Sequence, residues 1–266
     1  MKKLVLFFIT LLPFQSIGQA IVIDTTQSLK KIDSTLADLA DTMFAKGYSD
    51  YSEPSSEDIF IANLKFALKN SKTFNYKFPV LRSVENGYAI RIKYSTDSLL
   101  RVFNWLSSQT GTLHKFPAIF QAKNHSEKVI VLNVEDGKEE EFIPVTLFTL
   151  LEKLPAANRQ LYLSFGSGQG STILPFEIYQ GFEVTDSSIN DSIDLFKSDS
   201  SISNILGIDY ESTWYDSSQR QDIPFSTYDE KTLTITYPEI TDSDKPLWTG
   251  KMKKLKFNGE YFIPTK

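Results

Sequence analysis

The sequence predicts an α+β fold in which an N-terminal helical hairpin packs on a large antiparallel β-sheet assembly. Apolar residues recur every three or four positions between residues 29 and 70, as they do on one face of a helix. From about residue 78 onward, short segments alternate apolar and polar residues, as in half-buried strands. Aromatic residues make up 13% of the chain, and their flat rings suit such a pleated surface.

Two helices are expected in the hairpin, over residues 29–46 and 55–70. The first carries a single apolar stripe, and Gly47 follows it as a stop signal. Ser55 or Ser56 offers an N-cap to the second helix, and acidic residues occupy its first turn. A short link joins the two helices, so we expect an αα-hairpin with one apolar face that needs cover from the β-layer.

The β-rich part is organised around residues 85–123, which predict three successive antiparallel strands at 88–94, 99–106 and 112–122. Later strands are expected at residues 128–134, 161–165, 173–179, 193–196, 205–210, 233–237, 252–257 and 261–263. About ten short strands with almost no helix between them favour an antiparallel sandwich or open barrel over a parallel α/β fold. No repeat period is present, so nothing argues for a small propeller, although it stays an alternative.

Four segments carry local signals that are more specific. Residues 144–154 fit either a short helix, by their leucine spacing, or a strand, by their β-branched residues. Residues 166–170 (GSGQG) predict a flexible turn, and residues 187–203 predict a solvated stretch rich in serine and aspartate. Residues 258–259 (Asn-Gly) predict a type I′ turn in the closing hairpin.

The N-terminus has the pattern of a signal peptide, so we expect an exported protein. Lys2 and Lys3 precede an apolar run over residues 4–12 that is too short to span a bilayer. Cleavage is expected near Gly18 or Ala20, and no cysteine stands there to carry a lipid. The mature chain would be periplasmic or secreted, with no transmembrane segment. The chain then divides into a signal peptide over 1–20, a helical hairpin over 21–72 and an antiparallel β-rich domain over 73–266.

Composition excludes several chemistries. The chain has no cysteine, which excludes disulfides, thiolate nucleophiles and cysteine-bound metals. Its net charge of −5 gives it no electrostatic attraction to phosphate backbones, so we expect no nucleic-acid partner. With only two histidines, a multi-histidine zinc site is impossible. We expect no cofactor and no bound metal.

Five residues are candidates for ligand binding: Trp105, His114, Tyr210, Trp214 and Tyr215. The aromatic rings are suited to stacking on a sugar or a peptide, but in a β-rich protein they are equally suited to the core. His114 is either a base or ligand on the sheet surface, or an inert histidine at the edge of the core. The sequence has no nucleophile elbow, phosphate loop or H-E-x-x-H pattern, so it names no catalytic residue.

Four short segments resemble segments of exported proteins: residues 101–105 (RVFNW), 110–114 (TGTLH), 162–166 (YLSFG) and 256–262 (KFNGEYF). Because of these segments, residues 85–266 resemble a group of exported β-rich proteins of Bacteroidota. The resemblance implies an envelope or secreted protein, and it brings no catalytic residue with it.

The function expected from the sequence is that of a non-enzymatic module which binds a ligand or a protein partner of the cell envelope. The alternative from another class is a glycan or peptide hydrolase whose carboxylates meet in space rather than in sequence. A structural envelope protein without a small ligand is the third interpretation.

Overall fold

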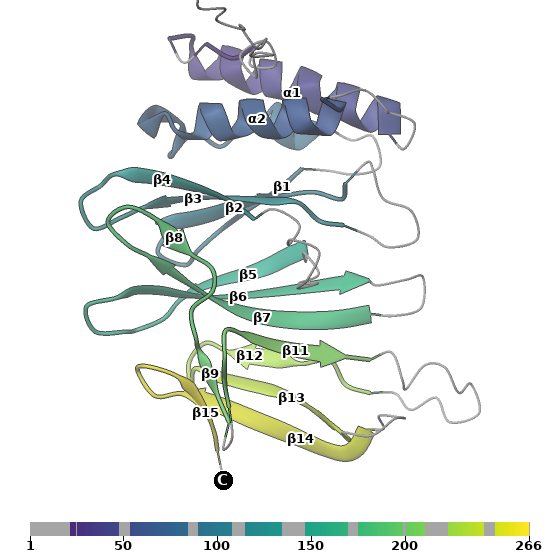
Figure 1. The fold of residues 1–266 in the computed structure, drawn as a ribbon, viewed down its shortest axis with the longest axis vertical. Coiled ribbons are helices and arrows are strands. Elements are labelled where there is room, and N and C mark those ends of the chain that lie inside the picture. The colour runs from purple at the N-terminus through teal and green to yellow at the C-terminus, as the bar shows by residue number, and fades with distance from the viewer. Residues whose placement is uncertain are drawn as a thin grey trace, which may run out of the picture.

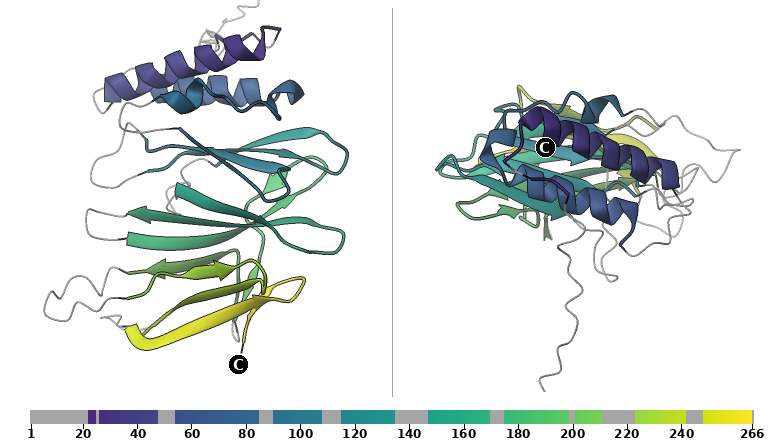
Figure 2. Two further views of the ribbon diagram at one scale, coloured as in Figure 1. Left: turned by 180° about the vertical axis from the view of Figure 1, so that it is seen from behind. Right: turned by 90° about the horizontal axis from the view of Figure 1, so that it is seen from above.

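A computed structural model describes residues 22–24, 26–47, 54–84, 90–107, 115–134, 147–169, 175–198, 201–210, 223–241 and 248–265. They form a stack in which a pair of helices is followed by three β-sheets (Figure 1). Figure 2 shows the same stacking from behind, and from above it shows the two helices side by side over the sheets. The predicted α+β fold is confirmed, and its β assembly consists of three sheets rather than one sandwich or barrel.

The helical layer consists of α1 (Leu29–Lys46) and α2 (Ser56–Leu68). Gly47 ends α1 with a positive φ of 52°, which its missing Cβ permits. Ser55 caps α2 by accepting the Asp58 N–H, and the Asp58 carboxylate accepts the Ser55 N–H in return. Both predicted helices are therefore confirmed; α1 has the predicted ends, and α2 ends at Leu68, two residues before the predicted end.

Sheet A has the strand order β1-β2-β3-β4, and all its neighbours are antiparallel. Its strands are β1 (Arg91–Tyr94), β2 (Leu100–Asn104), β3 (Ala118–Lys123) and β4 (Val129–Val134). β2 and β3 are buried on both faces, because Phe103 and Ile119 face the helices while Val102 and Phe120 face the next sheet. The three successive strands expected within residues 85–123 are thus present, at the centre of the upper half of the stack.

Sheet B has the order β11-β7-β6-β5, with β8 paired to β7. Its strands are β5 (Leu147–Lys153), β6 (Gln160–Gln169), β7 (Pro175–Val184), β8 (Ile189–Asn190) and β11 (Ile205–Asp209). The segment that fitted either helix or strand is the edge strand β5, because it pairs along β6.

A glycine inside β6 corrects one prediction. Residues 166–169 belong to the strand, so the flexible turn predicted for 166–170 is wrong over these residues. Gly168 pairs with Phe176 of β7, and the Phe176 ring occupies the space where a Cβ on residue 168 would lie. The glycine therefore serves close packing within a strand rather than a turn.

Sheet C has the order β10-β9-β15-β14-β13-β12, antiparallel except for the parallel pair β15–β9. Its strands are β9 (Phe196–Lys197), β10 (Ile202–Ser203), β12 (Thr227–Asp229), β13 (Thr234–Ile240), β14 (Trp248–Phe257) and β15 (Phe262–Pro264). The stretch predicted as solvated, 187–203, is only partly so, because it contributes short strands and buried side chains such as Ile189 and Leu195.

The closing hairpin of β14 and β15 is confirmed, but its predicted type I′ turn is wrong. A type I′ turn needs positive φ at both central residues. Here Gly259 has φ 104°, whereas neither Asn258 nor Glu260 has a positive φ. Asn258 instead holds the turn by accepting the N–H groups of Glu260 and Tyr261 at 2.9 and 2.8 Å.

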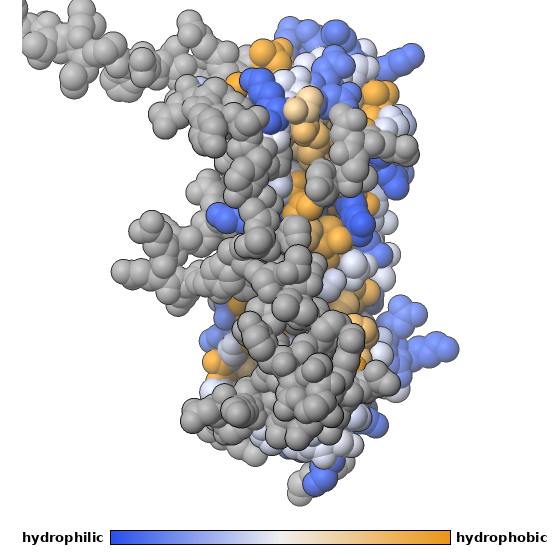
Figure 3. Space-filling view, turned by 90° about the vertical axis from the view of Figure 1, so that its right-hand side faces the viewer, coloured by the Kyte–Doolittle hydropathy of each residue, from blue (hydrophilic) through white to orange (hydrophobic). Residues whose placement is uncertain are grey.

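Three apolar cores lie between the layers. The first joins the helices to sheet A, the second joins sheets A and B, and the third joins sheets B and C. Residues of high hydropathy also reach the surface at several heights of the stack (Figure 3). Each sheet thus takes its stability from contacts with the layers next to it.

A buried arginine joins the helical layer to sheet A. Arg101 of β2 is 0% exposed, and its Nη1 and Nη2 donate to the carbonyl oxygens of Tyr76 and Thr73 at 2.8 and 2.7 Å. Its Nε donates to Gln121 Oε1 at 2.7 Å, and Gln121 in turn donates to the Leu68 carbonyl. Burial lowers the pKa of the guanidinium, which has no ion pair with a described carboxylate.

The segment over residues 73–81 is also held from the other side. Asp33 of α1, likewise 0% exposed, accepts the N–H groups of Val80 and Leu81 at 3.0 and 2.9 Å and the Tyr76 hydroxyl at 3.1 Å. Arg101 of sheet A thus binds carbonyl groups of the segment, and Asp33 of α1 binds its amide groups, so both layers hold it.

Arg101→Lys is expected to destabilise the protein by about 3 kcal/mol, because a buried polar network then loses one of its members. The ammonium keeps the charge but cannot reach the Gln121, Tyr76 and Thr73 oxygens together. The midpoint of urea unfolding measures this. Arg91→Lys, on the exposed side of β1, is the control and should change stability by less than about 0.5 kcal/mol. Equal midpoints for the two variants would contradict the role given to Arg101.

Candidate functional site

Trp105 follows β2 and is a core residue in this structure, with 0% exposure. Its Nε1 donates to Glu57 Oε1 at 2.8 Å, and its ring packs edge-on against Phe60 with 5.2 Å between centroids. Ser107 donates its hydroxyl to the other Glu57 oxygen at 2.6 Å. The indole thus joins α2 to sheet A and offers no face to a ligand.

Tyr210 follows β11 and is 1% exposed. Its hydroxyl donates to Glu177 Oε2 at 2.6 Å, and the Ser226 N–H donates to the same oxygen at 3.0 Å. Burial, followed by the bond to Glu177, raises the pKa of Tyr210. The exposed ring beside it is Phe225, which meets Tyr210 edge-on and is 60% exposed.

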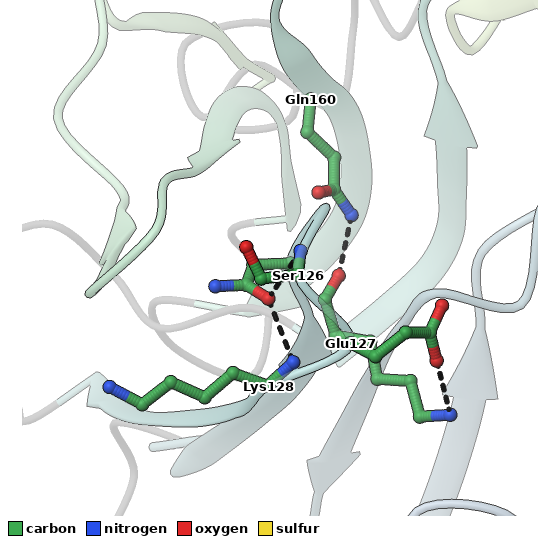
Figure 4. Close-up of polar contacts among 6 residues, drawn as sticks. Ser126, Glu127, Lys128 and Gln160 are labelled. Atoms are coloured by element: carbon green, nitrogen blue, oxygen red, sulfur yellow. Dashed lines mark hydrogen bonds and ion pairs between the residues drawn. The ribbon is translucent and has the colours of Figure 1, made fainter.

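The other three candidates, His114, Trp214 and Tyr215, lie outside the described residues, so their roles stay predictions. The second histidine, His125, is exposed in the turn between β3 and β4. Within that turn, the Asn124 side chain accepts the N–H groups of Ser126 and Lys128 (Figure 4). Gln160 of β6 donates to the Lys123 carbonyl, which lies just before the turn.

A groove of about 730 Å³ lies between β11, at the edge of sheet B, and the strands of sheet C. This volume is in the range of small-molecule sites. Phe196, Leu206 and Leu255 give it an apolar wall that continues into the core between the two sheets. Hydroxyl groups line another part of it, from Ser198, Ser201, Ser203 and Thr265.

The charge of the groove is strongly positive. Lysines line it together with one described carboxylate, Glu239. Glu239 Oε2 accepts the Thr249 hydroxyl at 2.9 Å and Oε1 pairs with Lys253 Nζ at 3.2 Å, and these contacts, the Thr249 bond first, lower the pKa of Glu239. The remaining lysines make no ion pair within the described part of the chain: Lys197, Lys251 and Lys254.

β14 lines the groove with residues 251–255, and successive side chains of this strand point to opposite faces of sheet C. Gly250 has φ 79°, and the register with β13 shifts between Pro238 and Ile240, so β14 carries an irregularity where it bends (Figure 1). Residues 251–256 (KMKKLK) follow this point and form the densest run of positive charge in the chain. That run is a sequence signal for the positive charge of this region.

A second polar cluster lies where the edges of the three sheets meet. Glu152 of β5 is 9% exposed, and its Oε1 accepts the Thr96 hydroxyl at 3.3 Å from the β1–β2 turn. Its Oε2 and the hydroxyl of Tyr228 on β12 are buried without a hydrogen-bond partner among the described residues. Burial, and then the charges of Glu230 and Asp97, raise the pKa of Glu152.

Within the described ranges, no group of three or more histidine, aspartate and glutamate residues is arranged to hold a metal ion. Among the described residues, no helix has the length and apolar character that crossing a membrane requires. Comparison of the chain with protein families, with curated proteins and with solved structures finds no match. Among the described residues, the groove is a cavity of ligand size with a positively charged lining.

Glu152→Gln is expected to stabilise the protein by about 1 kcal/mol at pH 7, because it removes a buried charge with an unpaired oxygen. A raised pKa in the folded state means that the contribution of Glu152 is fully present below its ordinary value of 4.5 and is lost as the pH rises through the folded value. The variant should not show this loss, so the two proteins should differ at pH 7 and agree at pH 4. Thermal unfolding across this range measures it.

Glu127→Gln is the control for this pH series, since the Glu127 side chain is 75% exposed in the β3–β4 turn. Its profile should follow that of the unaltered protein. Parallel profiles for Glu152→Gln and the unaltered protein would show that burial does not raise the pKa of Glu152 in the folded state.

Proposed function

We propose that this chain is an exported, non-enzymatic binding protein of the cell envelope, and that its ligand lies in the groove between β11 and sheet C. The observation that carries the proposal is the groove itself, with lysines and hydroxyl groups along an apolar wall. The signal-peptide pattern of residues 1–20 supports export.

The groove chemistry favours binding over catalysis. Its described carboxylate, Glu239, is committed to Thr249 and Lys253, and no histidine lies among its described lining residues. Hydrolysis of a glycan or peptide by a carboxylate pair needs an acid and a base that reach the substrate. The groove offers fixed positive charge and hydrogen-bonding groups instead, which hold a ligand without altering it.

One observation favours the hydrolase alternative, and it lies elsewhere. The raised pKa of Glu152 is what a general acid needs, and the charge of Asp97 acts on it. Glu152 is only 9% exposed, however, and its neighbours are the edges of the three sheets rather than the groove. A substrate that entered the groove would not meet it, so binding is the better account.

The proposal predicts that a groove ligand raises the melting temperature and that filling the groove abolishes the effect. The probes are neutral glycans, acidic glycans, muropeptides and Ca²⁺, and a ligand at about 100 times its Kd adds about 2.7 kcal/mol. That corresponds to a shift of about 5 °C or more in a chain of this size.

Ser201→Trp places a large ring in the groove, and Ser126→Trp, in the exposed β3–β4 turn, is its control. The shift should disappear in the first variant and persist in the second. A shift that survives Ser201→Trp, or no shift with any probe, would reject the groove as the binding site.

A further inference from the structure

We propose that the outer face of sheet C docks on a bilayer surface that contains anionic phospholipids. Sheet C forms the end of the stack opposite the helices, and its outer face points away from sheet B (Figure 1). The central part of this face consists of the side chains of Lys197, Ile202, Met252, Lys254, Lys256 and Ile263. The proposal adds a second contact surface to the molecule and does not depend on the groove.

Strand alternation decides which side chains of sheet C reach its outer face. Three central strands each place a side chain in the core shared with sheet B: Phe196, Leu255 and Phe262. Successive side chains of a strand point to opposite faces, so the neighbours of these residues point away from sheet B. Those neighbours are Lys197, Lys254, Lys256 and Ile263.

The pairing register then arranges the outward side chains in a row across four strands. Lys197 lies opposite Ile202, and Lys256 lies opposite Ile263. In the parallel pair β15–β9, Phe262 lies opposite Phe196, so the next residues, Ile263 and Lys197, are also side by side. The row therefore alternates between isoleucine and lysine from β10 to β14.

The spacing of the lysines matches a surface with many anions. Lys197 and Lys256 are two strands apart, which corresponds to about 10 Å, and Lys254 lies about 7 Å from Lys256 along β14. The three charges are spread over the face rather than directed at one point. A bilayer presents a headgroup to each of them, whereas one small anion would not.

The lysines of this face are free to meet an anionic partner. All three are exposed, and none forms an ion pair with a carboxylate in the described part of the chain. Lys197 Nζ lies over the Tyr261 ring, 5.6 Å from its centroid. The chain as a whole has a net charge of −5, so a positive face makes the molecule electrically asymmetric and orients it toward an anionic surface.

Carboxylates at the margin of the face are engaged in their own turns. Asp229 of β12 accepts the Lys231 N–H at 2.9 Å and the Thr232 hydroxyl at 2.8 Å. Glu260, in the β14–β15 turn, bonds to the Tyr261 hydroxyl and thereby raises the pKa of Tyr261. The centre of the face keeps its positive charge, which an anionic surface would complement.

Exposed apolar side chains between the lysines favour a lipid as the carrier of the negative charge. Ile202 is 48% exposed and Met252 is 37% exposed. In water these side chains gain nothing, but at a bilayer they can enter the boundary between headgroups and acyl chains. The flexible lysine stems allow the ammonium groups to stay at the level of the phosphates.

Other anionic partners fit this face less well. Its central outward side chains are lysine, isoleucine and methionine, whereas the core of a protein interface is depleted in lysine and enriched in aromatic residues and arginine. Single-stranded nucleic acids need exposed aromatic rings on which bases stack. A duplex contacts charge alone, which leaves Ile202 and Met252 without a role.

The test measures cosedimentation of the protein with two kinds of vesicle. One contains phosphatidylcholine alone, and the other contains equal parts of phosphatidylcholine and phosphatidylglycerol. We expect at least about tenfold stronger binding to the second, at about fivefold for each lysine near an anionic surface. Binding should fall as NaCl is raised from about 0.05 to about 0.5 M, because salt screens exposed charges.

Lys197→Gln/Lys254→Gln/Lys256→Gln should weaken binding to the anionic vesicles by about 100-fold, the product of the three single effects. The corresponding triple Lys→Arg variant should bind like the unaltered protein. The control is Lys30→Gln/Lys31→Gln/Lys69→Gln, which changes the net charge equally at the helical end and should leave binding unchanged. Every variant has the same N-terminal region, so any contribution of residues 1–20 is common to all.

Ile202→Ser/Met252→Ser tests the apolar contribution without a change of charge and should weaken binding by about fivefold, since it removes apolar surface that the bilayer would bury. Val22→Ser/Phe225→Ser removes two exposed apolar side chains elsewhere and is its control. Thermal unfolding of each variant checks that the fold is kept.

Equal binding to the two kinds of vesicle, or binding to neither, would overturn the proposal. Equal losses in the two triple glutamine variants would show that net charge acts rather than this face. Unchanged binding of Ile202→Ser/Met252→Ser would overturn the choice of a bilayer over another anionic surface. Tighter binding to poly-glutamate or to duplex DNA than to the anionic vesicles would replace the lipid by an acidic protein or a nucleic acid.

Discussion

The upper half of the molecule depends on the hydrogen bonds of one buried cation. Arg101 places its guanidinium, 0% exposed, against the carbonyl groups of residues 73 and 76, while Asp33 takes the amides of residues 80 and 81 from the opposite side. Burying a charge is costly unless its hydrogen bonds are made, so the segment between the two layers has one acceptable position. Once that segment is fixed, the helices lie over sheet A and the first core closes between them.

The opposite end of the stack is built on different physics. Sheet C has its inner face in the core shared with sheet B, but at β14 the charged residues outnumber the buried ones, and the groove opens beside them. The two ends of the stack therefore differ in how their polar groups are placed. The helical end consists of satisfied, buried polar groups that specify the fold, and the sheet C end carries four lysines and one described carboxylate along its groove.

The sequence predicted the elements whose signals are local, and missed those that depend on distant partners. The capped helices, the alternating strands of sheet A and the closing hairpin all follow from a few adjacent residues. Gly168 looked like part of a turn because nothing nearby reveals that Phe176 covers it. The burial of Trp105 and Tyr210 could not be predicted for the same reason, since their hydrogen-bond partners Glu57 and Glu177 lie far away in the sequence. The groove joins β9, β11 and β14, which no local pattern connects.

The order in which strands enter the sheets constrains how the chain folds as it grows from its N-terminus. Sheet A is complete at β4, but sheet B closes only when β11 arrives, after β9 and β10 have already left for sheet C. Sheets B and C are thus interlaced, and no single cut of the chain separates them into two folding units. Until β11 is present, sheet B lacks one of its strands and the core between sheets B and C lacks Ile208. A chain that has not yet added β11 therefore exposes apolar surface, and such a partly folded state is prone to aggregate.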